Sequence, residues 1–164
     1  MDLRIEVNGV GLSPGAVSVP TDLAAAGLER LAPWHRWLRH LPPHCQYWEA
    51  ADPRVVCFDG EVEIYPCRHS YLDRDRQWGT GCLVRLHEGR VAGIEVRIID
   101  GVYAASNLYD RFLEAGVRWL GEPDRAESRL AEWSRGQVTV AAMLAEDAMS
   151  ALFRVELGNG DAGR

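Results

Sequence analysis

The feature that most constrains the fold is a set of segments in which apolar and polar residues alternate. Two such segments can pair only in a register that brings their apolar side chains onto the same face of the sheet. Asp59-Gly60, a dipeptide typical of two-residue hairpin turns, separates two short segments of alternating apolar and polar residues. A two-residue loop there pairs Val55 with Ile64 and Cys57 with Val62. Apolar side chains then meet on one face, so the pattern predicts an antiparallel hairpin with that face buried.

A second hairpin follows from the same reasoning. Residues 81–87 and 91–100 alternate on either side of Glu88-Gly89-Arg90. A three-residue loop, with its glycine in the left-handed conformation, places Val84 opposite Ile94. A two-residue loop would put the two apolar sets on opposite faces. We therefore expect the three-residue loop.

Two further hairpins are expected near the ends of the chain. Asn8-Gly9 follows the alternating residues 3–7 and predicts a tight turn. Residues 137–145 and 148–157 are expected to pair around Glu146-Asp147, although Glu-Asp is not a preferred two-residue turn and a wider loop stays open. The expected partners are Val138 with Val155, Val140 with Phe153, Ala142 with Ala151, and Leu144 with Met149.

Two segments have helical periodicity. Leucine and tryptophan recur at helical spacing over about 21–41, where Pro33 should kink the helix and Trp34 and Leu38 should share its core face. A central helix is expected over about 106–120. Hairpins between helices, without a βαβ rhythm, predict an α+β fold whose largely antiparallel sheet packs with these two helices.

Length and charge limit the functions that the chain can have. Its 164 residues favour one domain over residues 1–157, followed by a frayed tail at 158–164. The formal net charge of −6 argues against nucleic-acid binding, which requires a basic surface. All 18 basic residues are arginine, and the lack of lysine excludes a Walker A loop, a pyridoxal Schiff base and a lysine-nucleophile aldolase.

The sequence shows no secretory signal and no membrane-length apolar run, so we expect a cytoplasmic location and no membrane association.

Cysteine and histidine residues raise two chemical hypotheses. Cys45, Cys67, His69 and Cys82 have the side chains of zinc ligands. None of them forms a pre-spaced Cys-x₂-Cys or His-x₃-His pair, and we expect no metal and no cofactor. Cys67 and His69, with Asp73 or Asp75 to orient the imidazole, have the residue types of a cysteine nucleophile and its base.

Two stretches have the composition of a protein-binding surface. Aromatic and histidine residues concentrate between positions 34 and 48, and arginine alternates with aspartate in the long segment 68–81. Tryptophan, tyrosine and arginine are the usual anchors of protein interfaces, and long loops are often functional. The tryptophans would equally suit a hydrophobic core, and both interpretations stay open. The candidate partner-binding residues are Trp37, His40, Tyr47, Trp48, Arg74 and Arg76.

The sequence favours binding over catalysis. It lacks the usual nucleotide-binding, metalloprotease, EF-hand and Gly-x-Ser-x-Gly motifs. The order of a helix, Leu-Gly-Glu-Pro, a Trp-bearing segment and two strands resembles the layout of many small bacterial binding proteins. We expect a non-enzymatic protein-binding module, similar to immunity proteins and antitoxins or to chaperones and adaptors. Its acidic charge suits a basic protein partner.

Two alternative functions stay open. One is a cysteine-dependent hydrolase or transferase that uses Cys67 and His69. The other is a small-molecule-binding domain with its pocket between a helix and the sheet. The sequence does not decide the oligomeric state.

Overall fold

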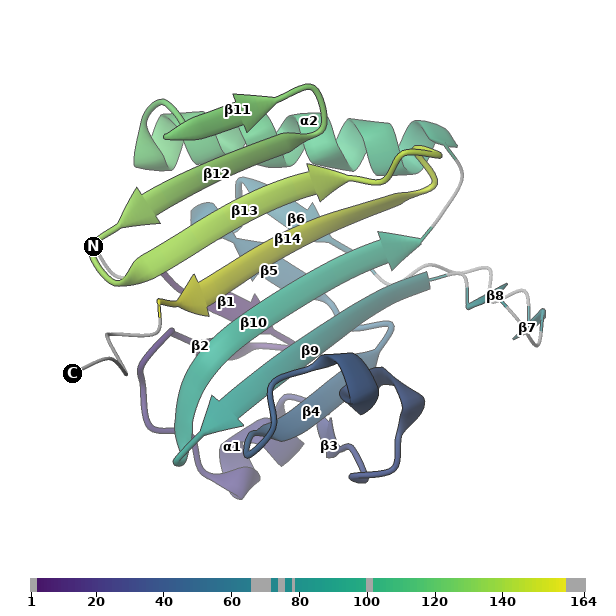
Figure 1. The fold of residues 1–164 in the computed structure, drawn as a ribbon, viewed down its shortest axis with the longest axis vertical. Helices are drawn as coiled ribbons and strands as arrows, with labels where there is room; N and C mark the ends of the chain where they lie inside the picture. Colours follow the sequence, from purple (N-terminus) through teal and green to yellow (C-terminus); the bar gives the residue numbers. More distant parts are fainter. Residues whose placement is uncertain (1–2, 66–71, 74–75, 78, 100–101, 159–164) are drawn as a thin grey trace.

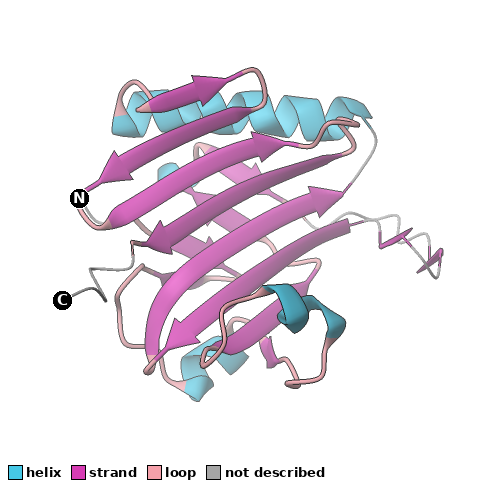
Figure 2. Ribbon diagram, viewed as in Figure 1, coloured by secondary structure: helices cyan, strands magenta, loops and turns pink. Residues whose placement is uncertain are grey.

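The fold consists mostly of antiparallel strands, as the hairpin pattern predicts (Figures 1 and 2). Every strand pairing among the described residues is antiparallel. The expected α+β class with a largely antiparallel sheet is therefore confirmed. The computed structural model describes residues 3–65, 72–73, 76–77, 79–99 and 102–158, and of residues 36–37, 72–73, 76–77 and 102–104 it describes the backbone alone.

Two main sheets and a short ribbon contain the strands. The eight-stranded sheet has the order β11 (Arg125–Glu127), β12 (Leu130–Arg135), β13 (Val138–Leu144), β14 (Ser150–Leu157), β10 (Arg90–Ile99), β9 (Gly79–His87), β4 (Gln46–Ala51) and β3 (Glu29–Arg30). The four-stranded sheet has the order β2 (Val10–Leu12), β1 (Ile5–Val7), β5 (Val55–Cys57) and β6 (Val62–Ile64). The ribbon pairs β7 (Leu72–Asp73) with β8 (Arg76–Gln77).

One face of the eight-stranded sheet supports the rest of the core. The long helix α2 (Val102–Leu120) packs across β12, β13 and β14, and the four-stranded sheet lies behind the large sheet in Figure 1. Buried side chains from both sheets and from α2 belong to one hydrophobic cluster. The opposite face of the large sheet, which we call the outer face, points toward the viewer in Figure 1, and segment 31–45 lies over one end of it.

The N-terminal region differs from the expected kinked helix over 21–41. It forms the short helix α1 (Pro20–Ala25), then β3, then the 3-10 helix η1 (Arg36–His40). Gly27 follows α1 with a φ of 70°, a left-handed conformation that ends helices, and Leu28 is buried directly after it. The leucine spacing therefore reflects separate short elements and not one amphipathic helix.

The second hairpin has the expected pairing but a different turn. Val84 pairs with Ile94, which confirms the predicted face parity. The three-residue loop is wrong, because Arg90 pairs directly with His87 and leaves a two-residue turn. A bulge between Val91 and Gly93 restores the parity by adding one residue to β10.

The last hairpin is shifted by two residues from the expected register. Val140 pairs with Val155, and not with Phe153. The backbone N–H of Ala145 donates to Ser150 O at 2.9 Å, so the loop is wider than the Glu146-Asp147 turn. Because side chains alternate with a period of two, this shift leaves every side chain on its predicted face.

The other two hairpin predictions are confirmed. Val7 pairs with Val10 across Asn8-Gly9, whose φ angles of 48° and 86° suit a type I′ turn. Val55 pairs with Ile64 and Cys57 with Val62. The turn between them contains the one-turn 3-10 helix η2 (Phe58–Gly60).

The central helix begins earlier than expected. α2 starts at Val102, whereas the sequence suggested about 106, and it ends at Leu120 before Gly121, as predicted. Residues 126–134, whose local pattern suits a helical turn or a short strand, lie in the hairpin of β11 and β12. No helix of the described chain combines the length and hydropathy needed to cross a lipid bilayer.

Gly116 of α2 should resist substitution because Trp133 packs directly against it. A Cβ atom at Gly116 would lie 2.7 Å from Cη2 of the fully buried Trp133 ring. We expect Gly116→Ala to lower the free energy of unfolding by about 1–2 kcal/mol, because so close a contact with a rigid ring costs about 2–3 kcal/mol in overpacking and the helix-propensity gain of about 1 kcal/mol offsets only part of it.

Chemical denaturation would measure this change, with Asn107→Ala as the control. Asn107 lies on the exposed side of the same helix, so its replacement gains helix propensity without a clash. A Gly116→Ala variant as stable as the control would contradict the predicted clash.

Candidate functional site

The segment between β3 and β4 carries the most exposed aromatic residue of the described chain. This segment, residues 31–45, which we call the Trp34 loop, is attached to the sheet at both ends. The backbone N–H of Leu31 donates to Tyr47 O at 2.8 Å, and Tyr47 Oη donates to Pro42 O at 2.7 Å. Pro33 prevents a continuous helix and directly precedes the tryptophan. These contacts order the loop over the outer face near β4.

Trp34 itself points into solvent. Its side chain is 83% exposed, although the sequence placed it with Leu38 on a core face. That placement is wrong because it assumed a helical segment from Pro33 to about position 41, whereas the helix found there is the short 3-10 helix η1, which begins after Trp34. The neighbouring His35 has a buried Nδ1 atom without a hydrogen-bond partner among the described residues. The loop therefore buries a polar atom while it exposes an indole.

Tyr47 and Trp48, two of the predicted partner-binding residues, lie inside the protein. Tyr47 is 4% exposed and Trp48 is 9% exposed. Burial, with a smaller contribution from Cys45, raises the pKa of the Tyr47 hydroxyl to about 12. The indole N–H of Trp48 is buried without a hydrogen-bond partner among the described residues. Among the described tryptophan and tyrosine side chains of the stretch 34–48, Trp34 is therefore the exposed one.

The remaining predicted partner-binding residues are described only in part. His40 is exposed at the end of η1. Trp37 lies in η1 and Arg76 in β8, but their side chains are outside the described part of the chain, as is the whole of Arg74.

The structure brings together a cysteine and a histidine that the sequence did not pair. Cys45 Sγ lies 3.8 Å from His87 Nδ1, and Cys45 is partly exposed. β4 and β9 run antiparallel with Gln46 opposite Leu86, which places the residue before β4 beside the last residue of β9. Local spacing gives no signal for this pair, because the two residues are separated by 42 positions.

The other cysteines have structural surroundings. Cys57 and Cys82 are buried, and burial raises the pKa of each thiol to about 12. Cys82 therefore lies in the core, away from the partly exposed Cys45. Among the described residues, no three His, Cys, Asp or Glu side chains are grouped so as to hold a metal ion.

The predicted cysteine nucleophile falls where the structure gives no geometry. Cys67, His69 and Asp75 lie outside the described residues, and only the backbone of Asp73 is described, in β7. Their hypothetical arrangement therefore stays a prediction from the sequence.

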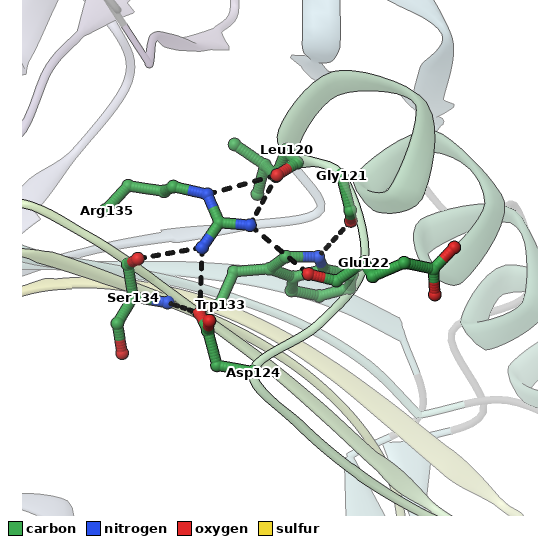
Figure 3. A network of polar contacts seen from close by, with 7 residues as sticks. All are labelled: Leu120, Gly121, Glu122, Asp124, Trp133, Ser134 and Arg135. Carbon is green, nitrogen blue, oxygen red and sulfur yellow. Dashed lines mark hydrogen bonds and ion pairs between the residues drawn. The ribbon is translucent and has the colours of Figure 1, made fainter.

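A network of polar contacts surrounds Arg135 (Figure 3). The Arg135 Nε donates to Leu120 O at 3.0 Å, and Nη1 donates to Asp124 Oδ2 and Ser134 O, both at 2.8 Å. Nη2 donates to Leu120 O and to Glu122 O. All five N–H donors of the guanidinium are therefore engaged, so this arginine holds the end of α2 and is not free to bind a ligand.

Trp133 completes the same network. Its Nε1 donates to Gly121 O at 2.8 Å (Figure 3). A helix leaves its last four carbonyls without partners inside the helix, and Trp133 and Arg135 supply donors for this end of α2.

The space between α2 and the sheet is filled with aromatic side chains. Phe112 stacks on Phe153 with ring centroids 4.6 Å apart, and Phe58 meets Phe153 edge-on at 5.4 Å. The described chain does have a shallow open groove on the solvent side of α2, lined by Leu113, Glu114, Val117 and Arg118. This groove lies outside the helix–sheet interior where the sequence suggested a small-molecule pocket.

Comparison with protein-family models, with curated proteins and with solved structures finds no match for this chain. The functional argument therefore rests on the chain's own geometry.

Asp124 should stabilise the protein in a pH-dependent way. Its carboxylate accepts from the Ser134 backbone N–H at 2.6 Å and from Arg135, and these bonds, the first above all, lower its pKa. A lowered folded-state pKa means that the stabilisation is present above the pKa of the unfolded chain. It is lost as the pH falls through the folded-state value.

We therefore expect Asp124→Asn to lower the melting temperature at neutral pH and to have little effect in acid. Melting curves of both proteins across this pH range would test the expectation. A melting-temperature difference that stays constant from neutral to acidic pH would show that the Asp124 charge is not responsible.

Proposed function

We propose that this protein is a non-enzymatic binding module that acts by holding another protein, in the manner of an immunity protein, an antitoxin, a chaperone or an adaptor. The observation that carries the proposal is Trp34, a large apolar side chain that is 83% exposed on an ordered loop. Isolated exposed apolar residues are common on protein surfaces, so the exposure matters because of its setting.

The setting of Trp34 favours an interface. Hydrogen bonds from Leu31 and Tyr47 fix both ends of the Trp34 loop, so little conformational entropy would be lost when a partner binds it. Tryptophan is the residue type most enriched among interface hot spots, because one side chain buries roughly 150–250 Å². The loop thus presents a pre-ordered anchor.

The charge of the chain indicates the class of partner. A net charge of −6 would speed encounter with a basic protein and disfavour nucleic acid. The proposed partner is accordingly a protein with a cationic surface.

Replacement of Trp34 should weaken partner binding without weakening the fold. We expect Trp34→Ala to reduce partner affinity by about 2 kcal/mol or more, which is about thirtyfold. The melting temperature should change little, because the side chain packs against almost nothing. Co-purification from cells that naturally make the protein would identify the partner, and titration calorimetry would measure the affinity.

Tyr65→Ala provides the matched control for this experiment. Tyr65 is an exposed aromatic residue directly after β6, which is the edge strand of the four-stranded sheet, whereas the Trp34 loop joins two strands of the eight-stranded sheet. Its loss should leave the affinity unchanged. Equal binding by the wild type and Trp34→Ala, with both proteins folded, would refute the proposal.

A second candidate function is a cysteine-dependent hydrolase or transferase, and the Cys45–His87 pair is the observation that favours it. A thiol within reach of an imidazole has the residue types of an activated nucleophile. The structure gives a distance for the Cys45–His87 pair, whereas Cys67 and His69 lie outside the described residues.

Thiol labelling separates the two candidates. In a Cys67→Ser background, we expect iodoacetamide to label Cys45 and to leave Cys57 and Cys82 unlabelled until the protein unfolds, because burial raises the pKa of both thiols to about 12. For a binding protein, His87→Ala should leave the labelling rate of Cys45 within about twofold. A fall of about a hundredfold, the usual size of general-base assistance, would favour the enzyme.

A further inference from the structure

The outer face of the eight-stranded sheet is an extended surface that the proposed binding function has not yet used. Strand register defines its rows of side chains, because residues directly opposite one another point to the same side. One row contains Glu29, Glu49, Leu83, Glu95, Arg154, Ala141, Glu132 and Arg125. The neighbouring row contains Arg97, Leu152, Met143, Leu130 and Glu127.

The second row has an apolar centre between charged ends. Leu152 pairs with Met143, and Met143 pairs with Leu130, so the three side chains are contiguous across β14, β13 and β12. Each of them is only partly buried. Arg97 and Glu127 flank this patch at its two ends. An apolar centre with a charged rim is the usual anatomy of a protein interface.

The arginines on the outer face are already engaged. Five arginines of the strands lie on this face, and each bonds to a group of this chain: Arg85 and Arg154 to Glu156, Arg97 to Glu95, Arg125 to Glu127, and Arg90 to Gly15 O. Arg30 of β3 is in a row of the covered face, because it pairs with Trp48 and Trp48 pairs with Val84. Among the residues that the structure describes, the outer face therefore has no arginine without a partner that could bind an anionic protein.

Some carboxylates of the outer face, in contrast, have no ion pair within bonding distance among the described residues. Glu29 and Glu49 lie directly opposite each other in β3 and β4, and neither forms an ion pair with a described residue. Like charges in directly opposite positions destabilise a sheet. Glu132 lies opposite Arg125 and interacts with it electrostatically, but it has no ion pair within bonding distance, because the Arg125 guanidinium is bonded to Glu127 at 2.6 Å. A cationic partner would neutralise all three carboxylates.

The size and position of the face also suit a partner protein. Eight strands at about 4.8 Å spacing, with an average length of about 20 Å, give a face of roughly 700–800 Å². A stable protein interface needs about 800 Å² from each side. The Trp34 loop, which carries the exposed indole, lies over the β4 end of this same face (Figure 1).

We infer that the outer face of the eight-stranded sheet is the docking surface for a basic protein partner, with Leu130, Met143 and Leu152 as its apolar centre and Glu29, Glu49 and Glu132 as its cation-binding groups. This inference rests on the proposed function and names the surface and the partner's chemistry. A second copy of the chain fits less well, because a twofold dimer would bring the same unpaired carboxylates onto both sides of the interface.

The first test uses a defined probe and two charge insertions. The probe is a synthetic peptide of alternating lysine and leucine, with the glutamate–leucine peptide as its charge-reversed counterpart. Calorimetry should detect binding of the lysine peptide alone, weakened by added salt. Met143→Arg should weaken it by about tenfold or more. Leu113→Arg on α2 makes the same charge change at a partly buried apolar residue on the covered side of the sheet, and it should leave binding within about twofold.

A second pair of variants covers the outcome in which Met143→Arg fails to fold. Glu49→Gln combined with Glu132→Gln removes two carboxylates from the outer face, and Glu114→Gln combined with Glu122→Gln removes two exposed carboxylates elsewhere. The first pair should weaken peptide binding and flatten its salt dependence, and the second should not. Equal effects of the two pairs, or equal effects of the two arginine insertions, would overturn the inference.

Two further outcomes would overturn the assignment of the docking surface without contradicting the proposed binding function. Light scattering that shows a dimer, converted to a monomer by Met143→Arg, would mean that a second copy covers the face. If the natural partner loses affinity for Trp34→Ala but binds Met143→Arg and the Glu49/Glu132 variant normally, the Trp34 loop binds the partner and the sheet face does not. If none of these changes affects the partner, the proposed function itself fails.

Discussion

The structure depends on the aromatic contact at which the large sheet, α2 and the four-stranded sheet meet. Phe153 of β14 stacks on Phe112 of α2 at 4.6 Å and receives the edge of Phe58 at 5.4 Å. Phe58 belongs to the turn of the small sheet, so one side chain of the large sheet joins both elements that cover it. Each ring buries a large apolar area, and the offset and edge-on geometries add to that area term. The covered side of the large sheet is organised around this junction.

The same arrangement leaves the large sheet with two unlike faces. The covered face holds the buried side chains Cys82, Val84, Ile94, Val96 and Phe153, and the outer face carries arginine–glutamate pairs with an apolar patch between them. An antiparallel sheet can expose one face to water when its residues alternate in this way. The proposed function uses that asymmetry: packing stabilises one face, and the other is available to a partner together with the Trp34 loop.

The candidate site could be predicted from the sequence only in part. The sequence directed attention to the stretch 34–48, and the Trp34 loop does lie there. Which aromatic residues are buried depends on β4, because its alternation and its covering loop bury Tyr47 and Trp48. The Cys45–His87 pair depends on the pairing of β4 with β9, which joins positions far apart in the chain. Neither arrangement has a local signal.

Local alternation determined which side chains share a face, and tertiary structure decided how the strands are aligned and what covers them. A period of two assigns each residue to a face whatever its partner, so Val84 met Ile94 although the turn was shorter than expected, and Val140 kept its face although its partner changed. The bulge after Val91, the wider loop before Ser150 and the exposure of Trp34 arise from packing between distant segments. Their free energies depend on contacts that no short stretch of sequence contains.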